Sequence, residues 1–163
     1  MLTPHSLHSL FSLVASALDQ TQQLFQLLET EQQALLSKDY DALEGISGKK
    51  LVLSRSLDLI EIQRQEIMAH VGQDTGIDSM QQFLLANKNN AAFKPLLASW
   101  DRLIISLQKS ADQNRINGIL LDKQHQHVQR ALNILFEQSN NPPVYDAAGD
   151  TRQTKYTRSV GIA

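Results

Sequence analysis

The chain has 163 residues, of which 42% are hydrophobic, so it is long enough to bury one substantial core. It contains no cysteine, which excludes disulfides and thiolate metal sites. Its 15 basic and 17 acidic residues give a net charge of −2 without a basic stripe, which argues against nucleic-acid binding.

The first predicted element is a helix over residues 4–37. Thr3 and Pro4 are typical of a helix start, because threonine accepts backbone N–H groups as an N-cap and proline fits the first helical position. No Lys or Arg precedes Lys38, which argues against a secretory signal. An apolar stripe recurs at steps of three and four residues or their sums, through Leu7, Leu10, Phe11, Val14, Leu18, Phe25, Leu28 and Leu35.

A second helix is predicted after a turn at residues 38–41, with Asp41 as its N-cap. Its apolar stripe consists of Leu43, Ile46, Leu53, Leu57, Ile60, Ile67 and Val71. A break follows at residues 72–78. Ser79 and Gln82 then match a capping box, which predicts a short third helix that ends at residues 87–90.

The last predicted helix, over residues 96–138, carries a heptad repeat that has to be buried against other helices. We therefore predict an all-α fold, an elongated antiparallel bundle of three long helices plus one short helix. An intermolecular coiled coil is the alternative. The heptad positions alternate steps of four and three residues through Trp100, Ile104, Leu107, Ala111, Asn114, Gly118, Leu121, His125, Val128, Leu132 and Leu135.

Two positions in the middle of this repeat, Asn114 and Gly118, have two interpretations. Asparagine at a heptad position fixes helix register, and glycine allows close approach of another helix. Alternatively, this thin and polar stretch is where a partner helix packs. Trp100 is interpreted as a core anchor rather than a binding residue.

The heptad pattern stops before residues 139–143, which include two consecutive prolines. We therefore predict two parts, a helical bundle over residues 1–138 and a flexible C-terminal tail over residues 139–163. No segment contains the roughly 18 continuous apolar residues of a membrane span, so stable membrane insertion is not expected.

The sequence nominates no catalytic, cofactor-binding or metal-binding residues. Residues 45–50 resemble a P-loop only superficially, because the spacing of the glycines is wrong and Lys50 stands where Ser or Thr is needed. His5 and His8 share a helix face but have no nearby carboxylate to complete a metal site. We therefore predict a protein that binds other proteins and is not an enzyme.

Two short motifs stand out in the C-terminal half of the chain. The first has the pattern Asn-x-x-Asn-Gly-x-Leu-Leu and consists of Asn114, Asn117, Gly118, Leu120 and Leu121, and the second has the pattern Tyr-x-x-x-Gly and consists of Tyr145 and Gly149. In this signature and this tail the chain resembles the FlgN family of flagellar export chaperones. The resemblance extends loosely to residues 29–32 and 49–51 of the N-terminal half.

The resemblance implies a cytoplasmic chaperone that binds hook-filament junction proteins through their C-terminal helical segments. It further implies that the chaperone prevents their premature assembly and delivers them to the flagellar type III export apparatus. The competing hypothesis is a structural coiled-coil adaptor without a chaperone role.

The first candidate partner-binding region is an apolar groove for the junction protein, formed by the end of the last helix and the tail. Its residues are Val128, Leu132, Leu135, Phe136, Val160 and Ile162. The alternative is that the helix residues belong to the core.

The second candidate region is Tyr145, with Gly149 allowing the chain to turn after it. The resemblance implies that Tyr145 contacts the cytoplasmic domain of the export gate. The alternative is that Tyr145 only tethers the tail.

Overall fold

The computed structural model describes residues 3–139, and all regular secondary structure within them is α-helical. The chain divides by its internal contacts into two units, Met1–Leu121 and Asp122–Ala163. The first unit contains α1, α2, α3 and the first part of α4. The described part of the second unit is the remainder of α4. An all-α fold with three long helices and one short helix is therefore confirmed.

Helix α1 spans Pro4–Ser37, as predicted. Thr3 caps it, since its Oγ1 accepts a hydrogen bond from the backbone N–H of Ser6 at 3.1 Å. The helix ends at Lys38, which adopts the left-handed conformation with φ 59°. The Lys38 N–H donates back to the Leu35 carbonyl, so the chain leaves the helix abruptly.

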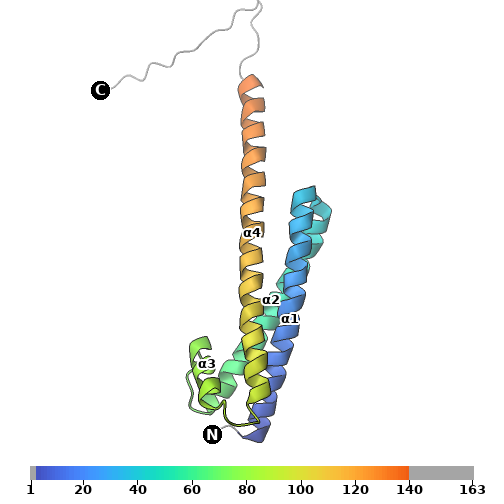
Figure 1. The fold of residues 1–163 in the computed structure, drawn as a ribbon. Helices are drawn as coiled ribbons and strands as arrows, with labels where there is room; N and C mark the ends of the chain where they lie inside the picture. The colour runs from blue at the N-terminus through green and yellow to red at the C-terminus, as the bar shows by residue number, and fades with distance from the viewer. Residues whose placement is uncertain (1–2, 140–163) are drawn as a thin grey trace, which may run out of the picture. The chain divides into compact units, whose positions relative to one another are not determined.

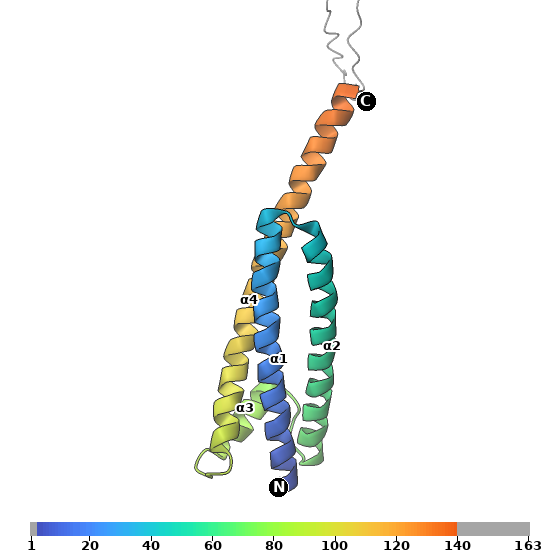
Figure 2. The same ribbon diagram turned by 90° about the vertical axis from the view of Figure 1, so that its right-hand side faces the viewer.

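Helix α2 spans Tyr40–His70 and runs antiparallel to α1 (Figure 2). Its N-cap is Asp39, whose Oδ1 accepts from the Ala42 N–H at 3.0 Å, so the prediction of Asp41 as N-cap is wrong. The left-handed residue at Lys38 reverses the chain within one residue. Helix α2 therefore begins at Tyr40, two residues before the start at residue 42 that Asp41 as N-cap would give.

Helix α3 spans Ile77–Ala86, and its N-cap is Gly76. The predicted capping box is wrong, because Ser79 lies inside the helix and donates its hydroxyl to Asp74 at 2.7 Å. This hydrogen bond, together with the backbone N–H groups of Thr75 and Gly76, holds the pKa of Asp74 below its ordinary value. The loop before α3 is therefore organised around a carboxylate rather than around a cap on the helix.

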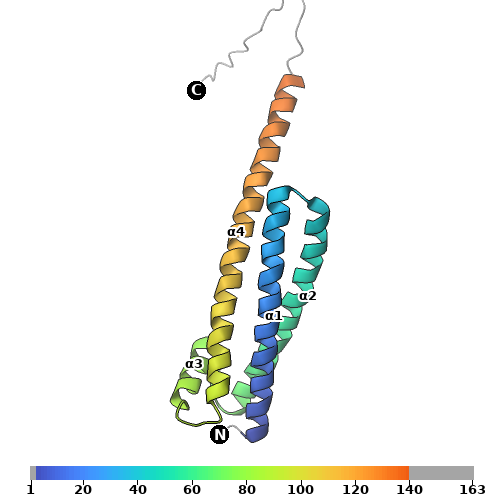
Figure 3. The same cartoon turned by 45° about the vertical axis from the view of Figure 1, so that its right-hand side comes forward.

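Helix α4 spans Lys94–Ser139. Within the first unit its initial turns lie beside α1, α2 and α3 (Figures 1 and 3). The main core of the unit gathers there, where α1 begins and α2 ends. Its buried members are Leu10, Val14, Ala17, Leu18, Met68, Met80, Leu84, Phe93, Leu96, Trp100 and Leu103.

The buried face of α4 differs from the predicted heptad repeat. Burial falls on Leu96, Leu103, Ser110 and Asn117, which are spaced by seven residues, with Trp100 between the first two. Trp100 is buried as predicted, whereas the predicted positions Ile104, Ala111 and Gly118 each lie one residue after the buried residue, which is Leu103, Ser110 or Asn117. Ser110 and Asn117 look like surface residues by composition, but they are buried with hydrogen bonds to α1. The predicted positions that are exposed in the first unit are Leu107, Ala111, Asn114, Gly118 and Leu121.

Candidate functional site

The apolar residues at the end of α4 are exposed in the structure. The exposed fractions are 51% for Val128, 40% for Leu132, 60% for Leu135 and 63% for Phe136, so none of them is a buried core residue. Spacings of three and four residues place them along one side of the helix. Exposed apolar side chains gathered in this way are typical of a protein-binding surface. The predicted groove residues Val160 and Ile162 lie outside the described residues.

The charges around this surface balance. Asp122 and Lys123 precede it, Arg130 lies within it and Glu137 follows it, so residues 122–137 carry no net charge with histidine neutral. The exposed apolar side chains, rather than charge, therefore distinguish this stretch of α4.

The two asparagines of the predicted signature have separate roles. Asn117 is 3% exposed, and its Nδ2 donates to the Leu28 carbonyl of α1 at 2.8 Å and to Glu31 Oε2 at 2.7 Å. Asn114 is exposed, and its Oδ1 accepts from Lys50 Nζ at 3.1 Å. The sequence interpretation gave the role of fixing helix register to Asn114. The buried contact with another helix is made by Asn117 instead.

Lys50 and Glu31 complete this polar cluster. Lys50 Nζ of α2 lies 2.9 Å from Glu31 Oε1 of α1, and both side chains are largely shielded from solvent. The cluster therefore joins α1, α2 and α4 within the first unit. Sequence reasoning placed Glu31 and Lys50 only in a loose resemblance. They are separated from Asn117 by 86 and 67 residues, so no local pattern links them to it.

The signature glycine does not mark a close helix contact in the free chain. A Cβ atom added at Gly118 would meet nothing within 4 Å, so the expected close approach is absent there. Leu120 is partly buried, whereas Leu121 is 54% exposed. Of the signature residues, Asn117 is therefore buried against α1, whereas Asn114, Gly118 and Leu121 are exposed.

We expect Gly118→Ala to raise the free energy of unfolding by about 0.5–1 kcal/mol, because glycine is unfavourable inside a helix and the added methyl group enters open space. Chemical denaturation measures the change. Gly45→Ala is a matched control, since that helical glycine also has nothing within 4 Å of an added Cβ. A loss of stability in Gly118→Ala alone would show that Gly118 packs closely after all.

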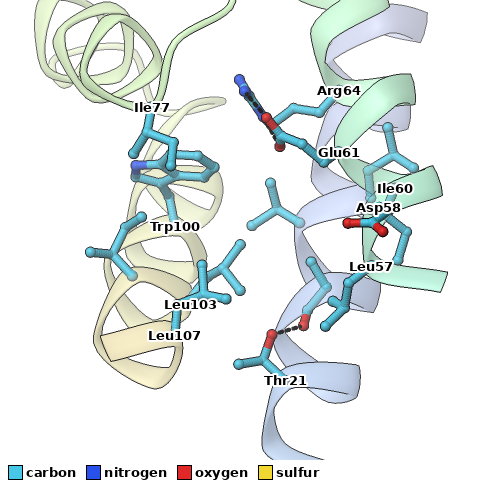
Figure 4. Close-up of a pocket in the computed structure, with 14 residues that line it drawn as sticks. Thr21, Leu57, Asp58, Ile60, Glu61, Arg64, Ile77, Trp100, Leu103 and Leu107 are labelled. Carbon is cyan, nitrogen blue, oxygen red and sulfur yellow. Dashed lines mark hydrogen bonds and ion pairs between the residues drawn. The ribbon is translucent and has the colours of Figure 1, made fainter. Parts of the chain in front are cut away.

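A pocket of about 260 Å³ lies among α1, α2 and α4 in the first unit, with Ile77 of α3 at one end (Figure 4). Its walls are mainly apolar. At the Ile77 end, Arg64 lies over the Trp100 ring, 5.6 Å from its centroid. Figure 4 shows side chains of α2 and α4 across the pocket from each other, namely Leu57, Ile60 and Glu61 on one side and Trp100, Leu103 and Leu107 on the other.

An ion pair stands at this end of the pocket. Arg64 donates from Nε to Glu61 Oε2 at 2.7 Å and from Nη2 to Glu61 Oε1 at 2.6 Å. Burial acts to raise the pKa of the Glu61 carboxyl, but hydrogen bonds from Arg64 and Gln65 and the Arg64 charge outweigh it, so the pKa lies below its ordinary value. The stabilisation from this pair is therefore present above the ordinary glutamate pKa and is lost as the pH falls through the lowered value.

No group of three or more His, Cys, Asp or Glu side chains that could hold a metal ion occurs within residues 3–139. None of the helices in the same part of the chain combines the length and the hydrophobicity of a membrane span.

The comparison with protein families identifies the family of this chain. A family model described as FlgN protein matches residues 1–153. The chain belongs to the FlgN family. No curated protein and no solved structure matches it significantly. FlgN proteins are flagellar export chaperones rather than enzymes, so this chain has a general role in binding flagellar export substrates.

The match includes the polar cluster, the pocket and the exposed end of α4. It also includes Tyr145 and Gly149, which lie outside the described residues. Sequence reasoning missed the pocket, because its walls come from three helices and its residues look like ordinary core positions. A possible signal was Arg64, a charged residue between the apolar positions Ile60 and Ile67 of α2.

Proposed function

We propose that this FlgN-family chain is a cytoplasmic chaperone of hook-filament junction proteins and binds their C-terminal helical segments through the exposed end of α4. The observation that carries the proposal is the exposed apolar surface of Val128, Leu132, Leu135 and Phe136 in a chain of an export-chaperone family. An amphipathic helix of the partner would bury its apolar face on this surface. Covering the partner's helix in this way would prevent it from assembling prematurely.

The direct test is a double substitution, Leu132→Asp with Phe136→Asp, in the full chain. We expect the Kd for the isolated C-terminal segment of a junction protein to rise by at least about tenfold, because two apolar contacts become charged. Isothermal titration calorimetry measures the affinity. Both side chains are exposed, so the circular-dichroism spectrum and the thermal midpoint should change little.

A matched control is Leu59→Asp, which charges an exposed leucine of α2. It should leave the Kd within about twofold of the unaltered chain. An unchanged Kd in the double variant would contradict the assignment of the site to α4. Deletion of residues 144–163 tests the predicted tail contribution of Val160 and Ile162, and full-strength binding by the truncated chain would exclude it.

For delivery, we propose that Tyr145 contacts the cytoplasmic domain of the export gate. Tyrosine offers a large rigid apolar surface with a polar tip at little entropic cost, and the Tyr145–Gly149 motif follows two prolines that disfavour helix continuation. Tyr145→Ala should therefore weaken gate binding while leaving the thermal midpoint and junction-protein affinity unchanged, as surface plasmon resonance and thermal melts would show. Lower thermal stability with unchanged gate affinity would instead support the tether interpretation.

A further inference from the structure

Helix α2 carries apolar residues on two opposite faces. Its inner face packs into the first unit and includes the buried residues Ile46 and Met68. Its outer face, at the edge of that unit (Figure 2), contains Val52, Leu59 and Ile62, which are 67%, 62% and 51% exposed. A helix on the surface of a single protein normally has one apolar stripe. The second stripe therefore indicates a surface that another helix covers.

The outer face of α2 follows a heptad pattern, which we call the α2 seam. Its positions alternate steps of three and four residues, and every one of them is exposed. This spacing places side chains along one line of the helix, as in helices that pack lengthwise against each other. The α2 seam consists of Gly45, Gly48, Val52, Arg55, Leu59, Ile62, Glu66 and Ala69.

Two charged residues, Arg55 and Glu66, stand within the α2 seam. Neither has an ion-pair partner within residues 3–139. A helix that covers the seam would shield both charges from water, so it has to supply an acidic residue opposite Arg55 and a basic residue opposite Glu66. A second copy of the chain carries one of each on the same seam.

Only one orientation of two copies brings these charges together. A parallel pair in register would place Arg55 against Arg55 and Glu66 against Glu66, which is repulsive. In an antiparallel pair, a two-fold axis between residues 60 and 61 places Arg55 beside the partner's Glu66. The same axis places Leu59 beside the partner's Ile62, and Val52 beside the partner's Ala69. Charge and apolar packing therefore agree on one register.

We propose that the chain forms an antiparallel homodimer through the α2 seam, in which Arg55 of each copy pairs with Glu66 of the other. Residues 52–69 provide a contact about 27 Å long at 1.5 Å per residue. A contact of this length suits a reversible dimer, and its two ion pairs fix register and orientation. The inference does not depend on the proposed function, because none of these residues belongs to the end of α4.

Charge reversal in the full chain tests the pairing, with sedimentation velocity over roughly 5–500 μM as the measurement for an interface of this size. Arg55→Glu and Glu66→Arg each place like charges at both pairs, so the dimer Kd should rise at least about tenfold in either variant. Both substitutions in one chain restore opposite charges and should restore the dimer. An equimolar mixture of the two single variants should form a heterodimer for the same reason.

The apolar part of the seam has its own matched pair of variants. Leu59→Asp should abolish the dimer, whereas Leu36→Asp, which charges a leucine of α1 that is 60% exposed and lies outside the seam, should leave it intact. All substituted residues are exposed, so the circular-dichroism spectrum of the dilute chain should not change.

Three outcomes would overturn the proposal. The first is an unaltered chain that stays monomeric at every concentration, since the seam would then serve another partner. The second is a dimer that persists at full strength in Arg55→Glu and Glu66→Arg, because the copies would then meet elsewhere. The third is a loss of the dimer in both single variants without recovery in the double variant or in the mixture.

Discussion

Asn117→Asp is expected to lower the free energy of unfolding by about 3–5 kcal/mol, the range for an unpaired charge buried in a protein. The Asn117 Nδ2 atom donates to the Leu28 carbonyl and to Glu31 Oε2, both within 2.8 Å. Aspartate would replace this donor with an oxygen that faces two acceptors, one of which belongs to a carboxylate. Because Asn117 is 3% exposed, water cannot screen the repulsion.

Urea denaturation followed by circular dichroism measures this change, with the slope of the transition checked for constancy. Asn117→Ala should cost less, about 1–3 kcal/mol, because it removes the donor without adding a charge. Asn114→Asp is the matched control three residues away, since that residue is exposed and its oxygen already faces Lys50. Equal effects of aspartate at positions 114 and 117 would show that the buried contact between α4 and α1 does not stabilise the protein.

Trp100→Ala should destabilise the protein by about 3–5 kcal/mol, the usual cost of truncating a large buried aromatic residue. Trp100 is 2% exposed and belongs to the main core. The substitution also removes the ring beneath Arg64, whose guanidinium carbon lies 5.6 Å from the ring centroid. The cavity that remains would join the existing pocket, so the surrounding side chains have little prospect of closing it.

Thermal and chemical denaturation of Trp100→Ala and Trp100→Phe separate the contributions. Phenylalanine keeps an aromatic ring in the core and omits the indole N–H, which has no acceptor among the described residues. Its cost should therefore be clearly smaller than that of alanine. A loss below about 1 kcal/mol in Trp100→Ala would contradict the interpretation of Trp100 as a core anchor.

The parts of the fold that depend on local chemistry were predictable. Thr3 and Pro4 determine where α1 begins, and the uninterrupted apolar stripe up to Leu35 determines how far it continues. The errors at Asp41 and Ser79 arose because several residues near each helix start could serve as caps. The choice among them depends on the backbone path, and in particular on the left-handed conformation of Lys38.

The candidate site was only partly predictable. The apolar residues from Val128 to Phe136 could be identified from spacing, but their exposure could not, because the same pattern is found in core helices. The burial of Asn117 depends on acceptors that are 86 and 89 residues away in α1. The pocket exists because three helices are spaced apart at this level. The periodicity of a sequence shows which face of a helix is apolar, but it does not show the distance between helices.

The abrupt turn at Lys38 and Asp39 also has a consequence for the order of folding. It joins α1 to α2 through a very short connection, so the two helices can pair through contacts that are local in sequence. The contacts of α4 with α1 close much longer loops and carry a larger entropic cost. During synthesis from the N-terminus, the α1–α2 hairpin is complete well before Asn117 is added. We therefore expect α1 and α2 to pair before α4 docks on them.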